Sequence, residues 1–234
     1  MKPWEDARIA RGMEAQLAAR RARIAAGEKP LGWKLGFGAP AAMQKLGISA
    51  PLIGFLMQRA LVVSGTSVDV KGWTQVVSEP EIAVRLARDV PPGSSTETVI
   101  SAIGSLAPAI ELADLDRVAT ADNVDAVLAG NIYQRHVVVG EASRTGGDLA
   151  DLNARIVRRG TEAASTNDPQ ALTGPIPVLL VHLADTLAAF GEHLKKDDLV
   201  ICGSVVAPAV IEPDETVFTY TLDPIGQVSV GFRV

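Results

Sequence analysis

Short runs rich in β-branched residues, which alternate with glycine and proline, recur along this chain from Leu31 onward and most constrain its fold. Such runs are typical of strands that end in turns. They comprise Leu61–Val63, Val76–Val77, Ile82–Val84, Val137–Val139, Leu199–Ile201 and Val228–Phe232. Because helices do not alternate regularly with these runs, a doubly wound parallel sheet is not expected. The pattern predicts an α+β protein built around a β-rich mixed sheet.

Helical patterns lie at the start of the chain and between the strands. The alanine-rich segment from Pro3 to Gly27 has apolar residues at helical spacing, and Gly27 ends it. Shorter helical patterns cover residues 39–46, 95–103 and 177–193. We therefore expect an α-helical N-terminal arm with a lysine-containing strand, residues 1–60, followed by a β-rich domain that carries the chemistry, residues 61–234.

Composition excludes several classes of protein. The net charge of −5 and the 4% aromatic content argue against a nucleic-acid partner, which calls for a basic excess or stacking rings. The single cysteine, Cys202, excludes an intrachain disulfide and a cysteine-based zinc cluster. No run reaches the roughly 18 apolar residues that a membrane span needs. Acidic residues lie among the arginines of the first helix, unlike in a transit peptide, so we expect a cytoplasmic protein.

Two glutamates two residues apart, Glu79 and Glu81, lie in a segment that alternates like a half-buried strand. In an extended chain they point to the same face, roughly 6.5–7 Å apart at Cα. Two carboxylates so placed repel each other unless water, an arginine or a cation lies between them. Arg85 shares their face and could be their partner on a solvated surface. Alternatively, the pair is half of a divalent-metal site.

A third carboxylate, Glu111, stands in the middle of an apolar run, where an unpaired charge would be costly to bury. Three converging glutamates carry a charge of −3, which a divalent cation would reduce to about −1. Oxygen ligands alone suit Mg²⁺ or Mn²⁺, whereas zinc would require cysteine or histidine ligands.

Lys34 and Gly203-Ser204 are further candidates with an ordinary alternative each. Lys34 lies in a strand-like run between glycines, where it either extends to solvent or supplies positive charge and a proton to an anionic ligand. Gly203 and Ser204 follow a strand, either as a plain turn or as a source of backbone amides and a hydroxyl for a ligand.

Taken together, these segments resemble the 2-keto-4-pentenoate hydratase / oxalocrotonate decarboxylase family, within the fumarylacetoacetate hydrolase superfamily. The resemblance spans nearly the whole chain in order and spacing. Its segments are Gly32-Trp33-Lys34-Leu35-Gly36, Leu46-Gly47-Ile48 with Pro51 and Gly54, Glu79-Pro80-Glu81-Ile82-Ala83, Pro108-Ala109-Ile110-Glu111, Asp122-Asn123, Gly203-Ser204 and Ile225-Gly226-Gln227-Val228.

The resemblance implies a β-rich roll of the fumarylacetoacetate hydrolase type that holds Mg²⁺ or Mn²⁺ on Glu79, Glu81 and Glu111. It implies a small anionic substrate, a 2-hydroxy-2,4-dienoate or related 2-oxo acid from aromatic-ring degradation, and often a homo-oligomer. The metal would act as a Lewis acid. Lys34 and Glu81 are the candidate catalytic residues. Lys34 would stabilise charge or move a proton, and Gly203 and Ser204 would contact the substrate.

Departures from the family pattern fall near these segments. Phe37 follows the lysine run, Cys202 precedes Gly203-Ser204, and Val178 stands where the family has asparagine. The stretch after Glu111 is also shortened, to Asp114-Leu115-Asp116-Arg117. They alter the expected substrate shell. Hydration is therefore the leading expectation, with decarboxylation of a 2-oxo acid or carbon–carbon hydrolysis as alternatives. The alternative without enzymatic activity is a degenerate relative of the family that only binds a small anion.

Overall fold

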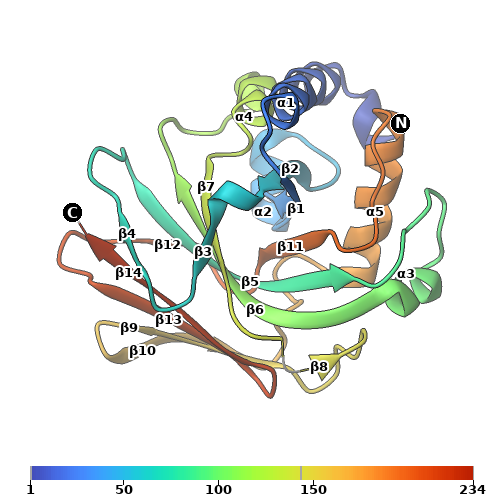
Figure 1. Cartoon of the computed structure of the whole chain (residues 1–234). Helices are drawn as coiled ribbons and strands as arrows, with labels where there is room; N and C mark the ends of the chain where they lie inside the picture. Colours follow the sequence, from blue (N-terminus) through green and yellow to red (C-terminus); the bar gives the residue numbers. More distant parts are fainter. Residues whose placement is uncertain (1, 143, 234) are drawn as a thin grey trace.

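Two β-sheets pack together, with helices over one side of the larger sheet (Figure 1). The computed structural model describes residues 2–142 and 144–233. Within them the α-helices are α1 (Ala7–Ala25), α2 (Pro40–Leu46), α3 (Thr96–Ala102), α4 (Val124–Ala129) and α5 (Ile176–Ala189). Single 3₁₀ turns are η1 (Pro3–Glu5), η2 (Gln58–Ala60) and η3 (Ala121–Asn123).

The larger sheet is mixed, with its main strands in the order β2-β1-β11-β5-β6-β7-β3, while β12 pairs with β5 and β8 with β6. Its strands are β1 (Pro30–Gly36), β2 (Leu52–Met57), β3 (Leu61–Val63), β5 (Val76–Leu86), β6 (Ile103–Asp114), β7 (Gln134–Val139), β8 (Arg144–Thr145), β11 (Leu199–Ser204) and β12 (Ala209–Val210). Strand β1 runs parallel to β11 and β3 parallel to β7, and the other pairs are antiparallel.

The smaller sheet has the order β10-β9-β13-β14-β4 and lies against the lower side of the larger one in Figure 1. Its strands are β4 (Ser67–Asp69), β9 (Asn153–Arg158), β10 (Thr161–Thr166), β13 (Val217–Asp223) and β14 (Gly226–Arg233). Together the sheets and the N-terminal helix confirm the predicted β-rich α+β fold.

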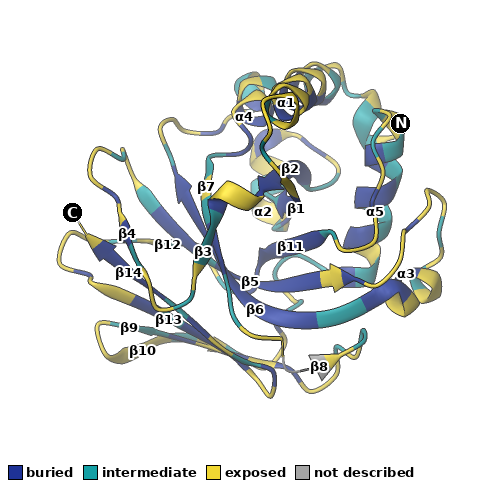
Figure 2. Cartoon of the chain, viewed as in Figure 1, coloured by how far each residue is buried: buried dark blue, intermediate teal, exposed yellow. Residues whose placement is uncertain are grey.

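Strand β5 separates two apolar clusters. Ile82, Val84 and Leu86 join the main core, whereas Ala83 joins a smaller cluster on the opposite face with Ala109 and Ile201, among others. Figure 2 shows the central strands buried along most of their length. Because both faces are covered in the middle of the strand, Glu81 and Ala83 are shielded from bulk water, whereas Arg85, further along the same face, is exposed.

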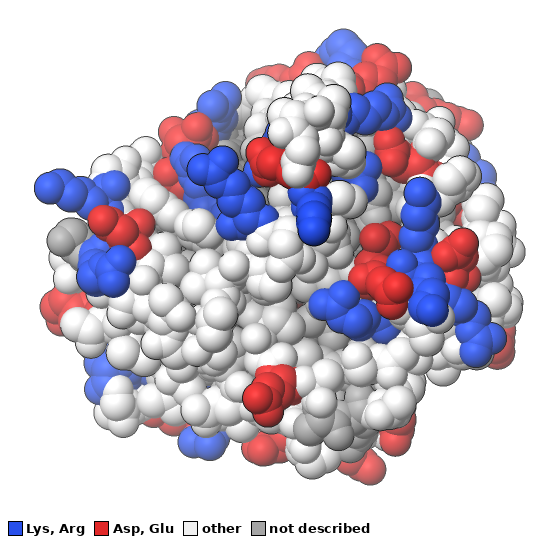
Figure 3. Space-filling view, in the orientation of Figure 1, with Lys and Arg blue, Asp and Glu red and all other residues white. Residues whose placement is uncertain are grey.

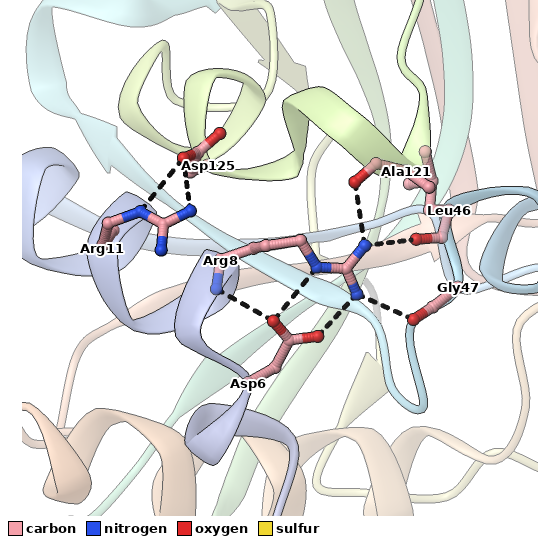
Figure 4. Close-up of polar contacts among 7 residues, drawn as sticks. All are labelled: Asp6, Arg8, Arg11, Leu46, Gly47, Ala121 and Asp125. Atoms are coloured by element: carbon pink, nitrogen blue, oxygen red, sulfur yellow. Dashed lines mark hydrogen bonds and ion pairs between the residues drawn. The ribbon is translucent and has the colours of Figure 1, made fainter.

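The N-terminal arm is built into the larger sheet, since β1 pairs with β11 and β2 pairs with β1. Helix α1 is also tied to distant segments through Arg8 (Figure 4). The Arg8 guanidinium donates to the backbone oxygens of Leu46, Gly47 and Ala121 at 2.8–3.1 Å. The boundary at residue 60 stays a prediction.

On the face shown in Figure 3, basic and acidic side chains lie interspersed, with broad uncharged areas between them. No helix among the described residues is long and apolar enough to cross a membrane.

Candidate active site

Three glutamates meet on one face of β5 and β6. The antiparallel register pairs Glu79 directly with Glu111, and Glu81 follows two residues further along β5. Directly opposed residues of an antiparallel pair share a face, as do residues two apart on one strand. Glu81 and Glu111 are almost fully buried, at 0% and 1% exposure, and Glu79 is partly buried.

Lys34 reaches the same face from β1. The register runs from Lys34 to Ile201 on β11 and from Ile201 to Ala83 on β5, which aligns Lys34 with the glutamate face. Its ammonium group forms a buried ion pair with Glu111 Oε1 and donates to the Ile132 carbonyl at 3.1 Å. The alternative that Lys34 extends to solvent is therefore wrong.

Arg85, the alternative partner for the glutamates, does not pair with them. Its side chain is exposed and donates to the Asp197 carbonyl oxygen at 2.9 Å. The cation that the structure places beside the carboxylates is Lys34. This arrangement contradicts the alternative in which Glu79 and Glu81 lie on a solvated surface with Arg85 as their partner.

One ammonium group stands against three carboxylates, and two of these, Glu79 and Glu81, have raised pKa values. Burial, followed by the charge of Glu111, raises the pKa of Glu79 to about 7. Burial, followed by the charges of Glu111 and Glu79, raises the pKa of Glu81 well above its ordinary value, although Lys34 and the Gly203 amide oppose this. The site therefore favours any further positive charge that can enter it.

Gly203 and Ser204 border the glutamates from β11. The Gly203 N–H donates to Glu81 Oε2 at 2.5 Å. Gly203 has φ +87°, and a Cβ added there would lie 3.0 Å from Thr173 Cγ2, so the position requires glycine. The buried Ser204 hydroxyl donates to the Val206 carbonyl at 2.6 Å. Both residues line the same cavity as Lys34.

That cavity has a volume of about 220 Å³ and opens beside Lys34, Glu79 and Ser204. Along the sheet its wall then becomes apolar. Val77 and Ala113 form the next pair on the face of Glu79 and Glu111, and both line the cavity. A small acid thus finds charged groups at the glutamates and hydrocarbon beyond them.

Tyr133 and its turn are cavity elements that sequence reasoning missed. The turn after α4 holds Asn131, Ile132 and Tyr133 at φ values of 57°, 52° and 61°, which side chains adopt rarely. The Asn131 amide group fixes the turn by bonding the backbone N–H and carbonyl of Phe55 at 2.8 and 2.9 Å. The Gly130-Asn131 pair after a helix is a local signal for such a turn. Strain of this kind clusters at functional sites.

The three single-residue departures from the family pattern lie in different places. Phe37 lines the cavity and contacts Tyr133 edge to face, with ring centroids 6.5 Å apart. Cys202 packs into the main core, and Val178 is exposed on α5. Phe37 is thus the one departure of the three that faces the cavity.

The side chains fit a hard divalent cation by their chemistry. Besides three carboxylates in one patch, Glu81 Oε1 is buried without a hydrogen-bond partner among the described residues. As the side chains stand, no three His, Cys, Asp or Glu groups in the described ranges form a ready metal cluster. Glu111 is turned to Lys34 and one Glu81 oxygen to the Gly203 amide, so a cation would compete with these two contacts.

Comparison with known structures first defines the class of fold. The chain matches a fumarylacetoacetate hydrolase from psychrophilic Exiguobacterium antarcticum with a TM-score of 0.68 at 12% identity, covering 88% of this chain and 75% of that one. This likeness shows that the chain shares the fold of that enzyme. No family model matches the chain.

Closer relatives narrow the assignment. A 2-hydroxyhexa-2,4-dienoate hydratase from Comamonas testosteroni is 29% identical over 217 residues, 91% of this chain and 81% of the relative. The 4-oxalocrotonate decarboxylase from Pseudomonas putida G7, solved with magnesium and adipate, matches with a TM-score of 0.86 at 26% identity, covering 96% of this chain and 86% of that one. Over most of its length the chain is therefore similar to hydratases of 2-hydroxydienoic and 2-keto acids and to 4-oxalocrotonate decarboxylases.

Proposed function

We propose that this chain is a divalent-metal-dependent lyase that adds water to a small 2-hydroxy-2,4-dienoate or 2-oxo-enoate in aromatic catabolism. The observation that carries the proposal is the patch of Glu79, Glu81 and Glu111 beside the buried Lys34, from which Glu79 and Lys34 line the cavity. Relatives named as hydratases of such acids support it.

Glu79, Glu81 and Glu111 are the proposed metal ligands. Mg²⁺ is the first candidate because a solved relative was crystallised with magnesium, and Mn²⁺ remains the alternative. When bound, such an ion supplies Lewis acidity to a carboxylate and the neighbouring 2-oxygen of a substrate. The partnerless oxygen of Glu81 and the raised pKa values of Glu79 and Glu81 support the choice of these ligands.

Lys34 is the proposed proton carrier. Its Nζ is held between Glu111 Oε1 and the Ile132 carbonyl, so its direction is fixed before a substrate enters. A proton leaving the substrate enol can pass through this pair while another is delivered to the diene during ketonisation, and water then adds to the far carbon. Gly203 and Ser204, at the cavity wall, are the proposed substrate contacts.

Decarboxylation of a 2-oxo acid is the second candidate, because relatives over the same length are named 4-oxalocrotonate decarboxylases. Carbon–carbon hydrolysis and simple anion binding remain alternatives from the sequence. A cytoplasmic location and a homo-oligomeric state also stay proposals, and sedimentation of the purified chain tests the latter.

Ultraviolet absorbance of 2-hydroxypenta-2,4-dienoate separates these functions. With Mg²⁺, we expect the conjugated band to disappear without release of CO₂, and a chelator should abolish the loss. Release of CO₂ from oxalocrotonate would favour the decarboxylase instead. Metal binding without turnover of any 2-oxo acid in a panel would contradict the enzyme and leave an anion-binding protein.

A further inference from the structure

The cavity wall beyond the glutamates is the part of the site that faces the tail of a substrate. The register leads from the Glu79–Glu111 pair to the Val77–Ala113 pair, and Leu115 follows two residues further along the chain. Each step of two residues advances about 6.5–7 Å along a strand. Val77, Ala113 and Leu115 all line the cavity, as do Phe37 and Tyr133. The tail of a short acid would therefore rest on hydrocarbon and rings.

Positive charge is scarce along this wall. Among the described residues that line the cavity, Lys34 is the single cation, and it is already engaged by Glu111 and the Ile132 carbonyl. Arg117 and Arg135 line a separate hollow on the other side of Tyr133. They are paired with Asp116 and Asp114 at 3.0 and 2.9 Å, so their charges are neutralised where they stand.

The Tyr133 hydroxyl adds no charge beside this wall. It is buried and has no hydrogen-bond partner among the described residues, while its ring packs edge to face on Phe37. Burial raises the pKa of Tyr133, which keeps the hydroxyl neutral. A neutral hydroxyl can donate one hydrogen bond, but it cannot compensate the charge of a buried carboxylate.

We infer that this cavity selects monocarboxylic 2-oxo or 2-hydroxydienoic acids with an uncharged tail and discriminates against dicarboxylic acids of the same length. Phe37, Leu115 and Tyr133 form the specificity-determining wall. The inference rests on the proposed function, which places the carboxylate and 2-oxygen at the glutamates. A second carboxylate on the tail would lose its hydration and gain no cation in return. The free-energy cost of burying an unpaired charge in an apolar pocket is large.

A matched pair of unreactive acids tests this selection without turnover. In the presence of Mg²⁺, titration calorimetry compares 2-oxohexanoate with 2-oxohexanedioate. The two acids have the same chain length, and a terminal methyl group in the first is a carboxylate in the second. We expect the monoacid to bind at least about tenfold more tightly, or about 1.4 kcal/mol. Equal binding, tighter binding of the diacid, or failure of both acids to bind would overturn the inference.

A charge introduced into the wall should reverse the preference. Leu115→Arg places a cation beyond the Val77–Ala113 pair, and Leu115→Gln is the control with a polar but neutral side chain. We expect Leu115→Arg to tighten diacid binding at least about tenfold and Leu115→Gln to leave it weak. An equal gain in both variants would contradict the role of charge. If Leu115→Arg does not fold, the binding of the two acids to the wild-type protein still tests the inference.

Turnover keeps the two proposals apart. If 2-hydroxyhexa-2,4-dienoate is not hydrated although 2-oxohexanoate binds preferentially, the proposed function fails and the selection stands. If the enzyme hydrates both the monoacid and its dicarboxylic counterpart with equal kcat/KM, or decarboxylates the diacid faster, the selection fails and a metal-dependent lyase remains.

Discussion

Glu81 is a buried carboxylate whose hydrogen-bonding capacity the described residues do not fill. It is fully buried, one oxygen accepts from the Gly203 amide and the other has no partner among the described residues. We expect Glu81→Gln to lower metal-dependent turnover roughly 100-fold or more, because a metal ligand and a charge are lost. Stability without metal should change little, since a buried carboxylate that favours protonation becomes neutral.

Steady-state turnover and calorimetric Mg²⁺ binding measure the effect of Glu81→Gln. Glu97→Gln is the matched control, because Glu97 is exposed in the first turn of α3. Unchanged activity in Glu81→Gln would remove this residue from the site.

Lys34 balances the carboxylates, and its loss leaves them unpaired. We expect Lys34→Met to lower turnover more than it lowers metal affinity, because the proton carrier is lost while the proposed ligands remain. Breaking a buried ion pair at one partner also costs about 3–5 kcal/mol, so the free energy of unfolding should fall in the absence of metal. Urea unfolding and Mg²⁺ titration measure both effects, with exposed Lys71→Met as the control. Persistent turnover would make Lys34 structural.

The strand alternation around Glu79 and Glu81 was sufficient to place both carboxylates on one face. Local sequence could not show which cation meets them, because Lys34 reaches them through the pairing of β1 with β11, in which Gly32 and Leu199 are 167 residues apart. Tyr133 could not be assigned to the site for the same reason: its position depends on the bond of Asn131 to β2.

At the scale of elements, Arg8 joins helix α1 to two distant segments of the chain (Figure 4). Its guanidinium binds the end of α2 at Leu46 and Gly47 and the start of η3 at Ala121. A lysine cannot reproduce this planar arrangement of donors. We expect Arg8→Lys to lower the free energy of unfolding by about 1–2 kcal/mol, the cost of one or two lost hydrogen bonds to backbone oxygens.

Arg11→Lys is the matched control for Arg8→Lys in the same helix. Arg11 is exposed and binds Asp125 at 3.0 Å, a surface pair whose loss should cost less than about 0.5 kcal/mol. Chemical denaturation of both variants gives the comparison. Equal effects would show that the three backbone contacts of Arg8 contribute nothing beyond a surface charge.

Elements with strong local signals were predictable, and those stabilised by distant pairing were not. The pattern at residues 95–103 predicted α3, where the Ser95 hydroxyl accepts from the Thr98 N–H and caps the helix. The β9–β10 hairpin was missed because its exposed positions carry charged, polar and small residues, and the two residues that it buries, Ala154 and Ile156, join the main core. Strand β9 is also held in the smaller sheet by β13, which follows about 60 residues later.

At the scale of the molecule, the buried acidic patch couples protonation and metal binding to folding. The folded-state pKa of Glu79, about 7, lies above its ordinary value of 4.5, so the folded protein holds more protons than the unfolded chain in that interval. Stability from this group is therefore present below about pH 4.5 and is lost as the pH rises through about 7. Glu81, whose pKa is also raised, acts in the same direction.

We therefore expect Glu79→Gln to flatten the metal-free fall in stability between about pH 4.5 and 7. The comparison with wild type is needed because burial lowers the pKa of His136 and of His182, which acts in the opposite direction, and the variant keeps both. Mg²⁺ requires deprotonated ligands, so its stabilisation should grow with pH and be larger at about pH 8 than at about pH 5.5. Thermal unfolding with Mg²⁺ or chelator measures this. A Mg²⁺ effect that does not change with pH would mean that the ion binds away from these carboxylates.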